Sequence, residues 1–167
     1  MANYPYPEVR LSELSKIAHS FHTVTSSDGA IVDTLIIRFV GSYGVGHKGN
    51  GDACYMRAVA SAGLEAWRPS ALVFDFSELE YVWGDMLSVV LSVGKGQISV
   101  LEMLFKQKIS DTSDLKAGDI PTLVVVSDRC SKAVRSLLEK EMSENPAKWM
   151  YDSLEAALFS ISNNEVA

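Results

Sequence analysis

Two short, almost wholly apolar runs constrain the fold of this chain more than any other feature of its sequence. Residues 71–76 read Ala-Leu-Val-Phe-Asp-Phe and residues 122–126 read Thr-Leu-Val-Val-Val, and a proline lies just before each run. Runs of this length and composition are typical of strands covered on both faces, as in a parallel sheet with helices packed against it. We therefore expect both runs to be central strands.

Segments with helical periodicity lie between and around these runs. The apolar residues from Met56 to Trp67 share one helical face. Arg68-Pro69 is expected to end that helix, because a residue before proline disfavours the helical backbone. The same periodicity predicts a helix from about Ser12, one over 86–93, and one over 100–105 that is followed by a loop at 110–119. A further helix is predicted from Val134 until Asn145-Pro146 ends it. The last predicted helix covers 154–161 and begins with a capping box of Asp152 and Glu155.

The alternation of helices with strands predicts an α/β fold. Residues 21–25 and 31–40 are rich in strand formers and flank Asp28-Gly29, a turn signal, so they are expected to pair as an antiparallel hairpin. Residues 149–151 indicate a further short strand. We expect a mixed sheet with a parallel centre, an antiparallel edge hairpin and helices packed against it.

The length of 167 residues suits one ordinary domain, and 47% apolar residues predict a packed core. We expect a helical N-terminal extension at 1–20, one domain at 21–161 with insertions at 41–52 and 94–120, and a disordered tail at 162–167.

Neither a secretory signal nor a membrane-spanning apolar stretch is found, which makes the cytoplasm the expected compartment. Cys54 and Cys130 are expected to be buried reduced thiols.

The charge balance narrows the expected partners. Fifteen Lys and Arg oppose 21 Asp and Glu, a net charge of −6, and no dense basic run is interleaved with aromatic residues. Nucleic acid and membranes are therefore not expected as partners, whereas a basic protein suits an acidic chain.

His19, His22 and His47 lack metal-ligand spacing with a cysteine, and no Gly-x-Ser-x-Gly or Cys-x-x-Cys occurs. We expect no catalysis, metal or cofactor.

A glycine-rich loop raises the possibility of a phosphate site. Residues 44–49 match the dinucleotide-binding pattern G-x-G-x-x-G between a predicted strand and a predicted helix. In a working site the third glycine packs inside the first helical turn. Here Asn50-Gly51-Asp52 intervenes, and Asp52 is expected to cap the helix, which puts a carboxylate where the phosphate would bind. We favour a mobile, partner-facing connection and keep a nucleotide or small-molecule site at 41–51 as the alternative.

The acidic turn after the first apolar run is the candidate site for a protein partner. Trp83 either anchors a partner, since tryptophan is enriched at interface hot spots, or is a half-buried lid on the core. Asp85 either contacts the partner or only starts the next helix, where the helix dipole favours a carboxylate. Acidic residues of the turn would steer a basic partner, and metal binding there by Asp75, Glu78 and Asp85 is disfavoured. The predicted partner-binding residues are Glu78, Glu80, Trp83, Asp85 and Met86.

The order of these segments resembles the STAS domains, the fold of the bacterial anti-sigma factor antagonists. Asp75-Phe76-Ser77 resembles the Asp-Leu-Ser triplet that ends a family strand, and Trp83-Gly84-Asp85-Met86-Leu87-Ser88 is similar to the Asp-Ser-Ser-Gly-Leu-Gly helix start. Residues 121–127, 133–138 and 152–158 resemble the next strand, the next helix and the closing Asp-Ser-Leu-Glu-Glu-Ala-Leu. The resemblance implies a STAS-like domain over residues 21–161.

The resemblance also implies a protein-binding role. In the family, a serine or threonine of the helix-start motif is phosphorylated by a kinase-like partner, which switches partner binding. Asp85 stands at the matching position here, and a fixed carboxylate resembles one charge of a permanent phosphate. We therefore predict a non-catalytic module that binds and restrains or regulates another protein. It is either a STAS-like regulator without the phosphorylatable serine or a small inhibitor such as an immunity protein for a toxin.

Overall fold

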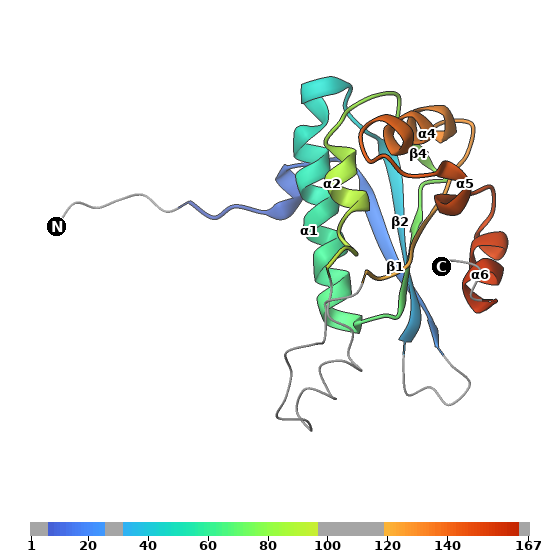
Figure 1. The fold of residues 1–167 in the computed structure, drawn as a ribbon. Helices are drawn as coiled ribbons and strands as arrows, with labels where there is room; N and C mark the ends of the chain where they lie inside the picture. Colours follow the sequence, from blue (N-terminus) through green and yellow to red (C-terminus); the bar gives the residue numbers. More distant parts are fainter. Residues whose placement is uncertain (1–6, 26–31, 97–118, 164–167) are drawn as a thin grey trace.

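The structure, a computed structural model, describes residues 7–25, 32–96 and 119–163 (Figure 1). Its six-stranded sheet has the order β1-β2-β3-β5-β6, and β4 pairs with β2 off this path. The β1–β2 pair is antiparallel and every other pair is parallel, which confirms the predicted mixed sheet. The strands are β1 (Ala18–Thr25), β2 (Val32–Ser42), β3 (Ala71–Asp75), β4 (Leu79–Glu80), β5 (Thr122–Val125) and β6 (Met150–Tyr151).

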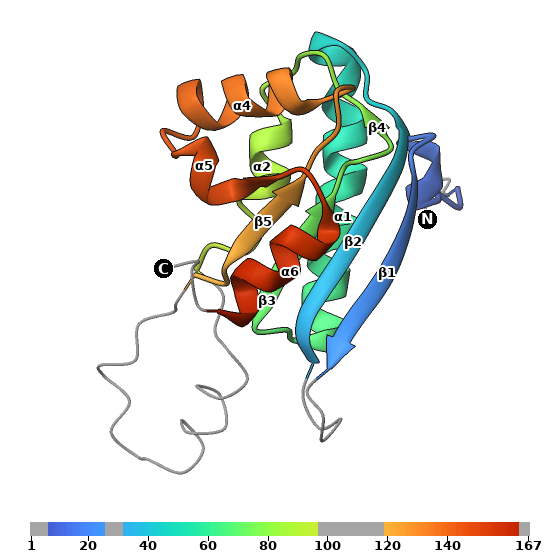
Figure 2. The same ribbon diagram turned by 90° about the vertical axis from the view of Figure 1, so that its right-hand side faces the viewer.

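The helices lie on both faces of the sheet (Figure 2). Strand order along the sheet follows the sequence, so each parallel crossover advances in the same direction. Because such crossovers are right-handed, α1, α2 and α4 cover one face, and α6 covers the other. The helices are the 3-10 turns η1 (Leu11–Glu13) and η2 (Gly46–Gly49), with α1 (Asn50–Trp67), α2 (Leu87–Leu91), α4 (Ser131–Lys140), α5 (Pro146–Trp149) and α6 (Leu154–Ser162).

The core is divided by the sheet because strand side chains alternate between its faces. Phe74 and Phe76 point toward α1 and α2, where they pack with Phe39 of β2; the three ring centroids lie 5.7–6.3 Å apart. Val73 points to the opposite face and joins the smaller cluster that packs on α6, around Ala157. All five residues of β3 are buried, which confirms that the first apolar run is a central strand.

The predicted N-terminal helix is wrong beyond one short turn. The 3-10 turn at Leu11–Glu13 is followed by strand β1, which begins at Ala18. Pairing with β2 satisfies the backbone groups on one side of this segment, and Phe21 packs on Trp67 at the end of α1, with ring centroids 4.8 Å apart. Tertiary pairing has therefore overridden a local apolar spacing that suits a helix.

Several predicted helix limits also change. The helix expected over 86–93 extends only over Leu87–Leu91, and α4 ends at Lys140 well before Pro146. Asn145 instead caps α5 by accepting a hydrogen bond from Ala147 N at 3.0 Å. Ser153, rather than a box of Asp152 and Glu155, caps α6 by accepting from Ala156 N at 3.2 Å.

Other expectations have mixed outcomes. The hairpin partners are confirmed, whereas the expected turn at 28–29, the helix at 100–105 and the loop at 110–119 fall largely or wholly outside the described residues. Cys54 and Cys130 are both free thiols, but only Cys130 is buried. Cys54 is exposed because it lies on the outer side of α1. The division into extension, domain and tail stays a prediction.

The phenylalanine cluster makes the first testable prediction. Phe74→Ala should lower the free energy of unfolding by about 3–5 kcal/mol, because it removes a fully buried ring and leaves a cavity among rings that cannot collapse into it. Phe159→Ala is the matched control, since the ring of Phe159 is 65% exposed and its loss should cost roughly 0.5 kcal/mol or less. Urea unfolding measures both; equal losses would contradict the assignment of the core.

Candidate functional site

The carboxyl ends of the parallel strands lie together at one end of the sheet, which we call its carboxyl edge, and Asp75 ends β3 there. Asp75 is 1% exposed and lies beside Arg38, its register partner on β2. Arg38 Nε donates to Asp75 Oδ2 at 2.8 Å, and Ser77 donates to Oδ1 through its backbone N at 3.0 Å and its Oγ at 2.6 Å. Both carboxylate oxygens are therefore engaged within the protein, which makes Asp75 a structural residue.

These contacts shift the pKa of Asp75. Burial of the carboxylate raises its pKa, but the hydrogen bonds from Ser77 and the guanidinium of Arg38 together outweigh burial and hold the pKa below its ordinary value. The pair is tightly coupled by geometry, since the same contact raises the pKa of Arg38. Asp75 therefore remains charged through the physiological range and ties β2 to β3.

The glycine loop and the acidic turn lie side by side at this same edge. β4 pairs in parallel with the last two residues of β2, Gly41 and Ser42. The pairing continues beyond the strands, because Tyr43 N donates to Glu80 O at 2.9 Å and Gly46 N donates to Trp83 O at 3.2 Å. Two segments that the sequence presents as separate motifs are thus one structural unit.

Close packing explains the glycines of this loop. Gly46 has φ +60°, and a Cβ there would lie 2.6 Å from the ring of Trp83. A Cβ on Gly49 would collide with the ring of Tyr43, and one on Gly44 would lie 2.7 Å from the carbonyl of Lys48. The loop is therefore closely packed, and its mobility stays a prediction. The loop needs glycine because its backbone passes directly against aromatic rings and against its own 3-10 turn.

Asp52 does not cap α1, in contrast to the prediction. The N-cap residue is Gly49, and Asp52 lies within the first helical turn. Its Oδ2 accepts from Gly44 N at 2.8 Å and its Oδ1 accepts from Ser15 Oγ at 2.5 Å. The carboxylate joins the loop, the N-terminal segment and the positive end of α1. A phosphate cradle would need the amides of Gly44 and Gly46, and both already donate within the protein.

Beside the loop, the acidic turn exposes apolar side chains. Val82 is 62% exposed and Trp83 is 57% exposed, and the exposed Met86 follows them. The backbone that carries them is fixed, since Tyr81 N donates to Arg129 O at 3.3 Å and Tyr81 Oη donates to Gly84 O at 2.8 Å. Burial, with a smaller contribution from the negative charge of Asp85, raises the pKa of Tyr81 to about 12, so this phenol keeps its proton.

A groove runs between this turn and helix α4. Its volume is about 170 Å³, and a larger groove of about 360 Å³ lies between α1 and α2; the glycine loop lines neither of them. Leu137 and Tyr81 supply apolar walls, whereas Asp85, Lys140 and Glu141 supply charges. The groove beside α4 is lined by Tyr81, Val82, Trp83, Asp85, Ala133, Ser136, Leu137, Lys140 and Glu141.

The structure divides the predicted site residues into two groups. Trp83 and Asp85 line the groove, and Met86 is exposed just before α2. Glu78 and Glu80 lie outside the groove lining: Glu78 Oε1 is 3.5 Å from Arg38 Nη1, and Glu80 Oε2 accepts from Ser42 Oγ at 2.6 Å. The structure therefore brings together an apolar surface with mixed charges rather than a uniformly acidic rim.

Sequence reasoning missed Val82 and the α4 side of the groove. The alternation of buried Leu79 and Tyr81 with exposed Glu80 and Val82 is a period-two signal that indicates an outward Val82. No sequence signal places Lys140 in the same groove as Asp85, because the two residues come from segments far apart in the chain. We call the patch formed by the exposed residues Val82, Trp83, Asp85 and Met86 the 82–86 surface.

The described ranges contain neither a candidate metal site nor a candidate membrane span. Within residues 7–25, 32–96 and 119–163, no group of three or more His, Cys, Asp or Glu side chains could hold a metal ion. None of the helices in those ranges is both long enough and apolar enough to cross a bilayer.

The buried carboxylate predicts a pH dependence of stability. The pKa of Asp75 in the folded protein lies below the ordinary value of 3.8, so its contribution is complete above pH 3.8 and is lost as the pH falls toward the folded pKa. Asp75→Asn should cost about 1.5–3 kcal/mol at neutral pH, since charged hydrogen bonds are lost.

Urea unfolding between pH 7 and pH 3 measures this effect. The difference between wild type and Asp75→Asn should shrink below pH 3.8. Asp152→Asn, at an exposed carboxylate, is the matched control. A difference that stays constant over this range would show that the charge of Asp75 does not stabilise the fold.

Comparison with known proteins identifies the fold. No family model and no curated protein matches the sequence. The crystal structure of an anti-sigma factor antagonist from Mycobacterium paratuberculosis matches with a TM-score of 0.50 and 14% identity, over 87% of this chain and 95% of that chain. The unphosphorylated anti-sigma factor antagonist SpoIIAA aligns over 88% of this chain and 97% of that chain, with a TM-score of 0.47 and 15% identity. The match to the Mycobacterium paratuberculosis structure shows that the chain has the STAS-like fold of an anti-sigma factor antagonist, as its sequence predicts.

Proposed function

We propose that this chain is a non-catalytic module that binds and regulates a partner protein through the 82–86 surface. The observation that carries the proposal is the exposure of Val82 and Trp83 on a backbone that three hydrogen bonds hold in place. An exposed tryptophan next to exposed aliphatic side chains is a costly arrangement in water and is typical of interaction sites. A fixed backbone lowers the entropy cost of binding, because the anchor is already presented to the partner.

The charges around the groove favour a partner with a basic group near its apolar anchor. Asp85 and Glu141 face the groove with one cation, Lys140, so its lining has an excess of negative charge. Glu78 is partly neutralised by Arg38 and contributes less to this field than the sequence predicts. Complementary charge would mainly orient the partner and speed association, whereas Trp83 would supply most of the binding energy.

The fold supports a regulatory form of this function. The matched structure from Mycobacterium paratuberculosis is that of an anti-sigma factor antagonist, and the chain resembles that family at the segment that carries Asp85. A carboxylate at this position gives a charge that no kinase or phosphatase can change. We therefore propose binding that is constitutive with respect to phosphorylation of residue 85. A regulator and a small toxin inhibitor are both versions of this function.

Two features disfavour the alternative nucleotide-binding function. Ligands of open α/β sheets bind where adjacent crossovers diverge to opposite faces, but here the parallel strands are added in one direction and α1, α2 and α4 share a face. In addition, Gly44 N and Gly46 N are engaged by Asp52 and Trp83. The loop serves the proposed function by packing against Trp83 and supporting it.

Affinity capture from a lysate of the native source tests the interaction function. Trp83→Ala with Asp85→Lys should reduce capture of the partner by at least about 30-fold, the loss expected for a hot-spot residue. Phe159→Ala with Asp152→Lys is the matched control, because it removes an exposed ring and reverses an exposed charge on or next to α6. Equal capture by wild type and by the Trp83 variant, both folded, would refute the proposed site.

Thermal unfolding with added nucleotides tests the alternative function. Neither ATP nor NAD should raise the midpoint of the wild-type protein, because the loop amides are not available to a phosphate. A rise that is lost in Gly46→Val, with the unliganded variant still folded, would establish a ligand site at the glycine loop. That result would favour the nucleotide-binding function over the proposed protein-binding function.

A further inference from the structure

We propose that strand β1 is a homodimer interface, at which β1 of one copy pairs antiparallel with β1 of a second copy around a twofold axis. β1 is an edge strand: in the part of the chain that the structure describes, it pairs with β2 alone. Figure 2 shows its other side along the border of the sheet. An edge strand presents unpaired N–H and C=O groups, which are the groups that a further strand would bind.

The composition of β1 is unusual for an exposed edge. The strand has eight residues, Ala-His-Ser-Phe-His-Thr-Val-Thr, with no Lys, Arg, Asp, Glu or Pro. Edge strands of monomeric proteins commonly carry charges or proline that prevent pairing with another chain, and the bulge of β1 lies only at its end, at Val24/Thr25. In a chain with a net charge of −6, a long uncharged edge indicates a strand that is covered by a partner.

The register that covers the regular part of β1 is self-complementary. A bulge at Val24/Thr25 leaves the seven residues from Ala18 to Val24 in regular pairing, and Phe21 is their centre. A twofold axis at Phe21 places Ser20 opposite His22 of the second copy, and Ala18 opposite Val24 of the second copy. The opposed pairs are therefore hydroxyl with imidazole and aliphatic with aliphatic, and no like charges meet.

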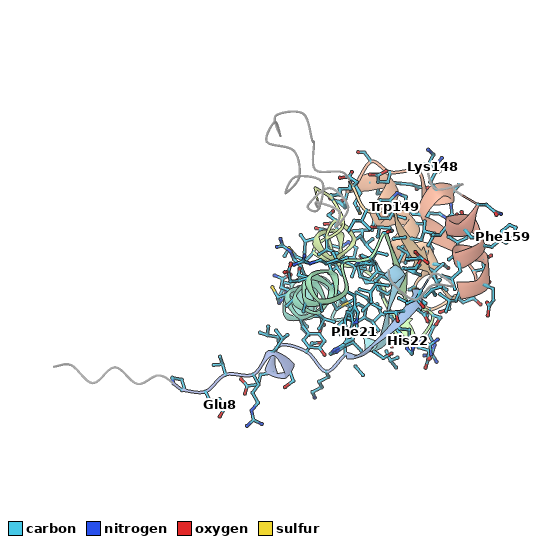
Figure 3. The ribbon with its side chains drawn as sticks, turned by 90° about the horizontal axis from the view of Figure 1, so that it is seen from below. Glu8, Phe21, His22, Lys148, Trp149 and Phe159 are labelled. Atoms are coloured by element: carbon cyan, nitrogen blue, oxygen red, sulfur yellow. The ribbon has the colours of Figure 1, made fainter. Side chains whose placement is uncertain are left out.

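The side chains on the open face of β1 suit this pairing. Ser20 Oγ and His22 Nε2 are 3.0 Å apart within one strand, so both atoms already have a hydrogen-bond partner and would not be left unpaired when a second copy covers them. Val24 is 39% exposed and would be covered by Ala18 of the second copy. Figure 3 shows Phe21 and His22 on β1 and Phe159 on α6, on another side of the molecule.

A second copy fits this edge better than an unrelated strand because the strand is complementary to itself in this register. Such an isologous contact uses the same strand on both copies, so assembly stops at two. The free backbone groups of both β1 strands are then paired, and no new unpaired strand is left at the interface. Edge pairing alone buries a modest area, so the dimer should be weak and concentration-dependent. This inference does not depend on the proposed function of the 82–86 surface.

Sedimentation velocity of the full chain over a wide range of concentration tests the dimer. The wild-type protein should shift from the mass of one chain to twice that mass. Ser20→Lys with His22→Lys should remain monomeric, because each lysine would face a lysine of the second copy. Ser20→Glu with His22→Glu should be monomeric for the same reason, and an equimolar mixture of the two variants should restore the dimer as a heterodimer.

The charge-swap mixture separates loss of the interface from loss of the fold, since misfolded variants would not recover on mixing. Ala147→Lys with Ala156→Lys is the matched control: it adds the same charge at exposed positions of α5 and α6 and should dimerise like wild type. The proposal is overturned if wild type is monomeric at every concentration, which would leave the edge to a strand of another protein. It is also overturned if the lysine variant dimerises as wild type does, or if the mixture stays monomeric.

Discussion

Burial of β3 on both of its faces is the constraint on which the rest of the structure depends. Its five residues are all buried, so helices α1 and α2 cover the Phe74 side and α6 covers the Val73 side. Because β2 and β5 pair with β3 in parallel, each connection crosses over the sheet and the parallel strands end at one edge. The segments after β2 and after β3 therefore emerge side by side, pair as β2 with β4, and bring Gly46 against Trp83. The candidate site is thus a consequence of the buried central strand.

The two proposed interaction regions lie on different parts of the molecule. The 82–86 surface follows β4 at the carboxyl edge of the sheet, whereas the proposed dimer interface is the outer border of β1. Neither 82–86 surface would belong to the interface strands of a dimer through β1, so one particle would carry two partner sites. Two linked sites can raise the avidity for a partner that is itself dimeric, without any new contact at either site.

The sequence by itself determined the elements whose signal is local. The apolar runs predicted β3 and β5, the stripe from Met56 to Trp67 predicted α1, and their alternation predicted the α/β sheet, because periodicity directly reports which side chains must be buried. The turn was also singled out, because acidic residues and Trp83 follow directly after the first apolar run. The strand at Ala18 was not found, because pairing with β2 overrides a local apolar spacing that suits a helix. The residues that cap α5 and α6 were not found either, because several neighbouring residues can cap a helix and only the folded backbone selects one.

Only the tertiary structure decided how the separate motifs combine. It placed Gly46 against Trp83, turned Asp52 toward Gly44 and Ser15, and brought Lys140 of α4 across from Asp85. Apart from the Gly44–Asp52 hydrogen bond, each of these arrangements brings together residues that are distant in the chain, so no local pattern in the sequence encodes it. The sheet decides them, because pairing in a fixed register determines which loops share an edge and therefore which side chains meet.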